Sequence, residues 1–349
     1  IDEKVSEYDS VYALVCPYGE DFMKEVSMAK TPSYSFLKSD NSAAATSPAV
    51  TDGNGSLPSE NTEQIMPLGF DENGNLFGQL DNNDLCLLDL DTFEVLKRTS
   101  PPRESGTSSY AVLPYGIVGY SSSLGSTTAK FYSSELEEIY CGEDTVICAV
   151  SPNYKKIFYG DYFDCYAGDI GGSIKTVLDS NEFYVSNAVF ISDDTIAFSG
   201  GNLADNSISS GAIGIYNISS DNVKWENCPY VNSEIKVFKN GVMFTENRSD
   251  GQTLYIVDKE FNIRKIAVEA GESNNAAISP NGKYIATCRF GSGSIIYRLY
   301  EAESGNKIGE IEKAGFAQLS IAVDNDGTVY GYYGKNSSNV NIESFELQN

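Results

Sequence analysis

The sequence predicts an all-β protein, a β-propeller of seven four-stranded blades, and three observations lead to that fold. Among 349 residues there are 23 Tyr, 17 Phe and 31 Gly, a composition that favours strands joined by tight turns. No stretch of ten or more residues has the apolar spacing of an amphipathic helix, whereas short alternating runs recur throughout. The third observation is a repeat of about 40 residues, the length of a propeller blade.

The repeat is clearest from Asn274 to Glu312, where a strand, an Asn-Gly turn, a second strand, a Gly/Ser loop and two further strands follow one another. The Asn-Gly pair predicts a two-residue hairpin turn, because such turns need positive φ angles. Comparable turns are DENGN, LPYGI, SPNYKK, SDDT, KNGV, SPNGK and DNDGT, centred on residues 74, 116, 154, 194, 241, 282 and 327. The intervals of 42, 38, 40, 47, 41 and 45 residues fit blades of four strands. A two-sheet sandwich is the competing fold.

The last blade is incomplete within its own stretch of sequence, because only two strands follow the final turn. The segment Val11–Cys16, VYALVC, is the candidate for the missing outer strand, which would close the ring by joining the first and last segments. Eight blades are the alternative count, since residues 20–40 contain the strand-like runs FMKEVSM and SYSFLKS. Residues 1–349 are therefore one domain, in which residues 39–64, rich in Ser, Ala, Asn and Pro, form a flexible loop.

The charge and the residue types present exclude several classes of function. A net charge of −25 repels nucleic acid and anionic membranes. The absence of histidine removes Ser-His-Asp and Cys-His catalysis and imidazole metal ligands. The seven cysteines are scattered without CxxC spacing, which predicts structural thiols. The turns at Asp71 and Asp324 fail the calcium-loop template because glycine comes too early, so no metal or cofactor is expected.

Candidate ligand-binding residues lie in the loops that join the second and third strands of the blades. These predicted loops are polar and include YSSSLGSTT from Tyr120 and ENRSDGQ from Glu246. Asp161, Tyr162 and Asp164 place two carboxylates and a phenol in one short loop, and Arg248 and Arg289 add guanidinium groups from two other blades. These groups suit a sugar or a peptide carboxylate. Tyr120 and Tyr333 are interpreted as packing or surface aromatics. No residue is assigned a catalytic role, because no motif selects one among 49 acidic residues.

The stretch Ser279–Ala286, SPNGKYIA, resembles the S-P-D-G-K-x-I-A hairpin of WD-repeat-like and TolB-like propellers, and SPNYKKIFY from Ser151 is a weaker copy. The Gly-His and Trp-Asp dipeptides of WD repeats are absent, and Trp225 is the only tryptophan. The resemblance therefore implies a propeller of the bacterial type, similar to the secreted or lipid-anchored propellers of Gram-positive bacteria.

Together these features predict a non-enzymatic binding or scaffold propeller that presents its loop face to a protein, peptide or glycan. The alternative is a secreted carbohydrate hydrolase or lyase that uses carboxylates at the channel mouth. The chain begins at Ile1 and contains no apolar span of 18 residues, so we expect an upstream segment that could carry a lipid anchor, rather than a transmembrane helix. An extracellular or envelope-attached location follows by analogy.

Overall fold

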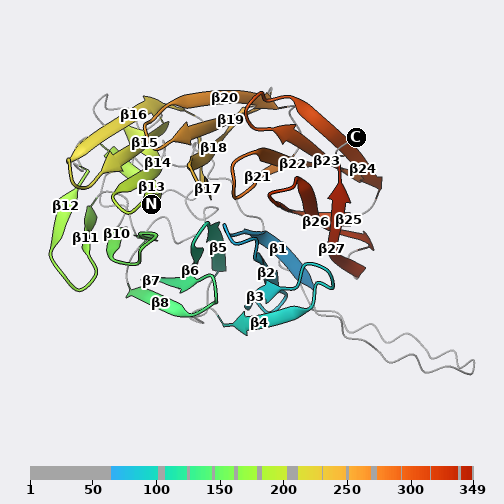
Figure 1. Cartoon of the computed structure of the whole chain (residues 1–349), viewed down its shortest axis with the longest axis horizontal. Coiled ribbons are helices and arrows are strands. Elements are labelled where there is room, and N and C mark those ends of the chain that lie inside the picture. The colour runs from blue at the N-terminus through green and yellow to red at the C-terminus, as the bar shows by residue number, and fades with distance from the viewer. Residues whose placement is uncertain are drawn as a thin grey trace, which may run out of the picture.

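The computed structural model describes residues 64–347, except for residues 101–106, 124–125, 144–145, 161–163, 179–182, 203–210, 230, 249–250, 269–272, 292, 315 and 337–338. The described residues form seven antiparallel sheets arranged as blades around a centre (Figure 1). In each sheet the strands pair in chain order, and contacts between first strands of different blades, such as β1 (Ile65–Phe70) with β5 (Thr107–Leu113) and with β25 (Phe316–Val323), place these strands toward the centre. The predicted seven-bladed β-propeller is thus confirmed.

Blades 1 to 4 each contain four strands. Blade 1 has β1 (Ile65–Phe70), β2 (Leu76–Leu80), β3 (Leu85–Leu88) and β4 (Val95–Thr99). Blade 2 has β5 (Thr107–Leu113), β6 (Gly116–Ser123), β7 (Ser126–Ser133) and β8 (Glu138–Glu143). Blade 3 has β9 (Ile147–Val150), β10 (Lys156–Gly160), β11 (Cys165–Asp169) and β12 (Ile174–Val177). Blade 4 has β13 (Phe183–Ser192), β14 (Thr195–Asn202), β15 (Gly211–Asn217) and β16 (Asn222–Asn227).

Blades 5 and 6 also have four strands, and blade 7 has three among the described residues. Blade 5 has β17 (Val231–Phe238), β18 (Gly241–Arg248), β19 (Gly251–Asp258) and β20 (Ile263–Val268). Blade 6 has β21 (Ser273–Ile278), β22 (Tyr284–Gly291), β23 (Ser294–Glu301) and β24 (Lys307–Ala314). Blade 7 has β25 (Phe316–Val323), β26 (Thr328–Asn336) and β27 (Asn339–Glu346). The predicted closing strand Val11–Cys16 and the strand-like runs of residues 20–40 lie outside the described residues.

The core lies between neighbouring blades, which explains the hydrophobic pattern of the strands. Middle strands such as β2 and β15 are buried on both faces, so apolar residues and glycines occupy both sides of the strand. Outer strands such as β24 alternate between exposed and half-buried residues, because one of their edges meets solvent. Five cysteines lie buried in this core, at positions 86, 148, 165, 228 and 288, and burial raises the pKa of the Cys288 thiol to about 12.

The ring closes where blade 7 packs against blade 1. The Tyr332 hydroxyl donates a hydrogen bond to Gln64 Oε1 at 2.8 Å, and the Ser320 hydroxyl donates to the Pro67 carbonyl. The ring centroids of Phe70 and Tyr330 lie 5.1 Å apart across the same seam. A core continuous from the last blade to the first supports the closed arrangement over a two-sheet sandwich.

The turns between the first two strands of the blades differ in part from the predicted two-residue hairpins. In the turn after β21, Gly282 occupies the left-handed region with φ +73°, and Ser279 Oγ accepts from the Tyr284 amide at 2.9 Å. Tyr154 occupies the corresponding position in SPNYKK with φ +58°, and its hydroxyl donates to the Tyr115 carbonyl at 2.7 Å. Only Lys239–Asn240 is a two-residue turn among the Asn-Gly sites, and there Gly241 begins the next strand. The repeat is therefore recognisable from turns whose geometry varies.

Acid should weaken blade 6 at its outer strand. Glu310 Oε2 accepts from Arg298 Nε at 2.6 Å and from Lys307 Nζ at 2.9 Å, and these two cations hold the pKa of Glu310 below its ordinary 4.5. A carboxylate whose pKa is lower in the folded state stabilises the fold above its unfolded pKa, and this contribution disappears as pH falls through the folded value. We therefore expect the difference in melting temperature between the wild type and Glu310→Gln, measured by calorimetry, to be largest near pH 7 and to shrink below pH ~4. A difference that grew on acidification would contradict this assignment.

Candidate functional site

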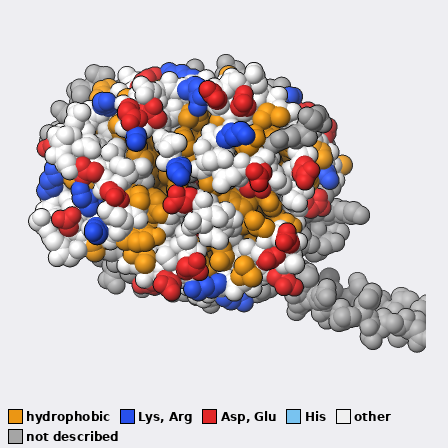
Figure 2. Space-filling model, in the orientation of Figure 1, with side chains coloured by type: hydrophobic (Ala, Val, Ile, Leu, Met, Phe, Trp, Pro, Cys, Tyr) orange, Lys and Arg blue, Asp and Glu red, His pale blue; other side chains and the backbone are white. Residues whose placement is uncertain are grey.

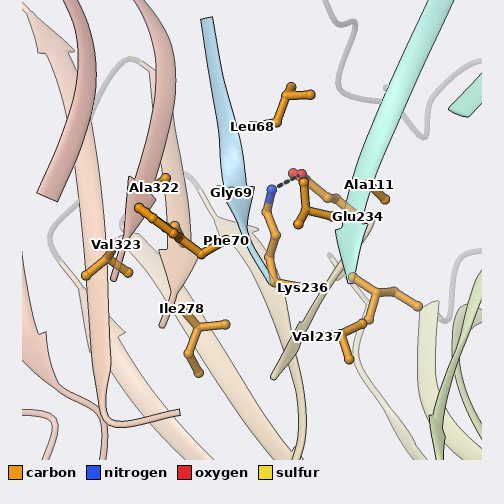
Figure 3. A pocket seen from close by; sticks show the side chains of 13 residues that line it. Leu68, Gly69, Phe70, Ala111, Glu234, Lys236, Val237, Ile278, Ala322 and Val323 are labelled. Atoms are coloured by element: carbon orange, nitrogen blue, oxygen red, sulfur yellow. Dashed lines mark ion pairs between the residues drawn. The ribbon is translucent and has the colours of Figure 1, made fainter. Parts of the chain in front are cut away.

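The centre of the propeller is narrowed by strand β17 of blade 5. This strand contacts β5 of blade 2, although blades 5 and 2 are not neighbours in the ring. Small residues on the other inner strands, Gly69, Ala111, Ala277 and Ala322, line a cavity between them (Figure 3). Their short side chains allow the inner strands to approach one another closely at this level.

An ion pair occupies this cavity. Glu234 and Lys236 lie two residues apart on β17, so their side chains project from the same face of the strand and pair with each other (Figure 3). About a quarter of each side chain is exposed. The surrounding residues are mostly apolar, including Leu68, Val237 and Ile278. The pair therefore neutralises its own charge and offers no net charge to a ligand.

The cavity is too small for a metabolite. Its volume is about 30 Å³, which holds about two water molecules, whereas small-molecule sites measure ~300–1,000 Å³. It lies at the end of the inner strands that leads into the turn to the second strand. A metabolite is therefore not accommodated in this cavity.

The structure describes the backbone of three of the predicted site residues. All three lie near ends of strands at the loop face. We use "loop face" for the side where the second strand of each blade leads into the third, and "turn face" for the opposite side. Asp164 is exposed and precedes β11, Arg248 is the last residue of β18, and Arg289 is half-buried near the end of β22. Asp161 and Tyr162 lie outside the described residues, as does the Arg248 side chain.

These positions come from blades 3, 5 and 6. The two arginines thus lie on adjacent blades, and blade 4 separates both from Asp164. Their common role in binding a ligand stays a prediction. Tyr120 is a packing residue, as interpreted from the sequence, because its hydroxyl donates to the Cys148 carbonyl at 2.8 Å, and burial raises its pKa.

Several loops are shorter than the sequence indicates. The predicted loop from Tyr120 is mostly strand, because β6 continues to Ser123 and β7 begins at Ser126. The sequence also predicts a polar loop from Glu246, but this residue lies within β18, fully buried, and accepts a hydrogen bond from the Tyr255 hydroxyl at 2.8 Å. Burial first, and then this hydrogen bond, raise the pKa of Tyr255. Ser, Asn and charged residues are typical of loops, but a blade can pair their backbones when the neighbouring strand is in register.

A stacked pair of tyrosines beside Asp164 was missed by the sequence reasoning. Tyr159 and Tyr166 are cross-strand partners on β10 and β11, both half-buried, with ring centroids 5.4 Å apart and an interplanar angle of 26°. A Cβ on Gly160 would lie only 2.2 Å from the Asp164 carbonyl, so the two strands meet closely at the base of this loop. The signal was present in the sequence, since the two tyrosines flank the loop at positions that a hairpin brings opposite each other.

The two turns that were compared with a calcium loop use their carboxylates to hold the backbone. Asp71 Oδ1 accepts from the Asn73 and Asn75 amides, each at 2.9 Å. Asp324 Oδ1 likewise accepts from the Asp326 amide at 2.9 Å and the Thr328 amide at 2.8 Å. Both are Asx turns that close a hairpin. The part of the chain that the structure describes has no group of three acidic, Cys or His side chains placed to hold a metal ion.

Comparison with known proteins finds similarity at the level of three-dimensional structure. No family model and no curated protein matches the sequence. The Swd1 (Cps50) β-propeller domain of Myceliophteria thermophila aligns with 81% of this chain and 100% of its own, with a TM-score of 0.56 and 10% identity. The chain is a seven-bladed β-propeller. The hydrazine synthase of Kuenenia stuttgartiensis aligns with 84% of this propeller and 100% of its own chain, with a TM-score of 0.52 and 13% identity.

U3-55K also resembles the propeller, over 78% of this chain and 89% of its own, with a TM-score of 0.51 and 12% identity. At these identities the likeness concerns the fold alone. No helix in the described ranges has the length and apolar composition required to cross a bilayer. On the face seen in Figure 2, acidic and basic side chains are interspersed, and hydrophobic side chains reach the surface between them.

Proposed function

We propose that this protein is a non-enzymatic binding propeller, secreted or attached to a bacterial cell envelope, which presents its loop face to a protein, peptide or glycan. The fold and its likeness to the Swd1 propeller and U3-55K are consistent with a binding or scaffold role. The candidate groups on the loop face are Asp161, Tyr162, Asp164, Arg248 and Arg289. Among them, Asp164 and the guanidinium groups suit hydroxyls, amides and carboxylates of a ligand.

The observation that carries this proposal is the structural use of the turn face. On the turn face, neighbouring blades are joined by hydrogen bonds between their first turns. The Glu72 amide donates to the Pro114 carbonyl at 2.9 Å, and the Lys239 amide donates to the Pro280 carbonyl at 2.8 Å. The Asn281 amide donates to Asn325 Oδ1 at 2.9 Å. Because these turns use backbone amides and carbonyls to hold the ring together, we favour the loop face for recognition.

The narrow cavity between the inner strands is a second support, because at its level there is no room for the substrate of the carbohydrate hydrolase or lyase considered from the sequence. Such an enzyme needs two carboxylates flanking a sugar ring with room for the substrate between them. At the level of the cavity the only acidic side chain among the lining residues is Glu234, and it is paired with Lys236. A binding role needs no such space within the ring.

A glycan array and a peptide array, probed with purified protein beside a panel of hydrolysis assays, test the proposal. For any ligand found, we expect Asp164→Asn and Arg289→Ala to weaken binding at least ~10-fold, which corresponds to about 1.4 kcal/mol. Lys239→Ala is the matched control, because Lys239 is an exposed charge on the turn face, and its binding should equal that of the wild type.

Three outcomes would contradict the proposal. Turnover of a glycan that is lost in Asp164→Asn would make the protein an enzyme. Binding that is weakened by Lys239→Ala and unaffected by the two loop-face variants would move the site to the turn face. Failure of every array ligand to bind, with a folded protein confirmed by circular dichroism, would leave no binding function to assign.

A further inference from the structure

A row of side chains crosses blade 3 on the face that packs against blade 2. Cys148, Tyr159, Tyr166 and Thr176 are cross-strand partners in successive strands, from the inner strand β9 to the outer strand β12, so their side chains share one face of the sheet. Ala129 of blade 2 packs with Cys148 and Tyr159, which covers the inner part of the row. The outer part of the row lies toward the rim of the propeller.

The aromatic stack in this row ends at Tyr166. One face of the Tyr166 ring meets Tyr159, and the neighbour on its other side is Thr176, which is small and exposed. On the outer strand of blade 2 the cross-strand partner of Ala129 is Gly142, which brings no side chain to this level of the seam. The second face of the Tyr166 ring is therefore the part that a ligand at the rim can reach.

An aliphatic side chain and a carboxylate border this ring. Ile174 pairs with Gly168, and a Cβ added to that glycine would lie 3.0 Å from Ile174 Cδ1, so the Ile174 side chain extends over the glycine. Ile174 is 39% exposed. Asp164, also exposed, lies two residues before Tyr166 at the loop-face end of β11. The ring thus has Ile174 on its turn side and Asp164 on its loop side.

The lysines of blade 3 are directed away from this ring. Lys156 pairs with Asp194, and Lys175 donates to the Ile218 carbonyl at 3.2 Å, and both partners belong to blade 4. Lys155 lies in the turn after β9, at the turn face. The face of blade 3 that meets blade 2 therefore carries none of the described lysines of its strands.

Blade 2 adds no cation to this seam among its described residues. Its lysine, Lys130, follows Ala129 on β7 and so lies on the opposite face of that strand, where it pairs with Glu138 at 2.7 Å. The ring of Tyr166 is thus bordered by a carboxylate, without a described cation of blades 2 and 3 beside it, in a protein of net charge −25. Charge complementarity then favours a cationic ligand.

We infer that the outer face of Tyr166 binds an arginine side chain of a basic peptide. The planar guanidinium stacks on the phenol ring, Ile174 covers the aliphatic part of the arginine, and the Asp164 carboxylate pairs with its charge. Arginine is favoured over lysine because the guanidinium is flat and more weakly hydrated than an ammonium group. This inference rests on the proposed binding function and names the class of its ligand.

Fluorescence anisotropy with a labelled oligoarginine peptide and its oligocitrulline counterpart tests the inference. Citrulline keeps the planar end of the side chain but removes its charge, so only the arginine peptide should bind. Tyr166→Leu removes the ring without changing the charge of the protein, and it should weaken binding about 2- to 30-fold, the range of one cation–π contact. Tyr166→Phe keeps the ring and should bind like the wild type.

Asp169→Asn is the matched control for Asp164→Asn, because each variant removes one exposed negative charge near β11. Asp169 is the cross-strand partner of Lys156 and therefore belongs to the face that meets blade 4. We expect Asp164→Asn to weaken binding and to reduce its dependence on salt, whereas Asp169→Asn should leave both nearly unchanged. Circular dichroism of each variant confirms that the protein is folded.

Each result decides the inference. A loss in Tyr166→Leu that Tyr166→Phe does not share supports it. Unchanged binding in Tyr166→Leu, or equal losses in the two aspartate variants, would show that overall charge attracts the peptide and would overturn it. A neutral glycan or acidic peptide whose binding is weakened by Arg289→Ala but not by Tyr166→Leu would overturn this inference and leave the proposed binding function in place. Failure of both the arrays and oligoarginine to yield a ligand would contradict both.

Discussion

Replacing Phe198 with alanine should destabilise the propeller by about 3–5 kcal/mol, with a fall in melting temperature on the order of 10 °C. Phe198 lies on β14, is fully buried and meets Phe183 edge to face with ring centroids 5.8 Å apart. Its ring covers Gly214 of the neighbouring strand, where an added Cβ would lie 2.4 Å from Phe198 Cζ. Truncation removes the apolar contacts and leaves a cavity that the paired strands cannot close.

The same contact provides a second variant that tests the cause of the loss. Gly214→Ala alone should destabilise by about 1–3 kcal/mol, because its methyl group collides with the Phe198 ring and also comes within 2.9 Å of the Lys224 carbonyl oxygen. In the double variant this methyl group enters the space that the ring vacated. The loss of stability in the double variant should therefore be smaller than the sum of the two single losses by about 0.5–3 kcal/mol. Guanidinium denaturation of all four proteins measures this coupling. Strictly additive losses would show that the ring and the glycine do not share this space.

The seven blades could be predicted from the sequence because their spacing depends on turn residues rather than on strand residues. Pro280 and Gly282 mark a turn whatever strands surround it, and SPNYKK keeps the same spacing although Tyr154 replaces glycine in the left-handed position. The lengths of the loops were predicted less well. Ser121 and Glu246 belong to strands because neighbouring backbones pair with theirs, and a single sequence does not show such pairing.

The candidate site was predictable only in outline. Positions 164, 248 and 289 lie toward the loop face, as predicted. Counting the strands from each predicted hairpin turn indicates at which end of a strand each of these positions lies. The stacked pair of Tyr159 and Tyr166 required the register between β10 and β11, and the ion pair of Glu234 and Lys236 required knowledge of which face of β17 meets the channel. Side-chain chemistry alone specified neither.

Gly282→Ala should be strongly destabilising, because it combines backbone strain with a steric collision. Gly282 has φ +73°, where an L-residue costs about 1–2 kcal/mol, and an added Cβ would also lie 2.5 Å from Phe238 Cδ2 in blade 5. Phe238 is itself buried, so its ring cannot move aside without opening the contact between blades 5 and 6. We expect a total loss of about 2–5 kcal/mol, the sum of the backbone strain and an overpacking contribution of about 1–3 kcal/mol.

Gly74→Ala is the matched control for that exchange, because it separates the two contributions. Gly74 has φ +84° in the equivalent turn of blade 1, and an added Cβ there would have no atom within 4 Å. It should therefore cost only the backbone strain of about 1–2 kcal/mol, and the difference between the two variants in chemical denaturation reports the collision with Phe238. Equal losses would mean that blade 5 yields to the methyl group. The contact between these two turns would then depend mainly on the hydrogen bond from the Lys239 amide to the Pro280 carbonyl, and less on the packing of Phe238 against Gly282.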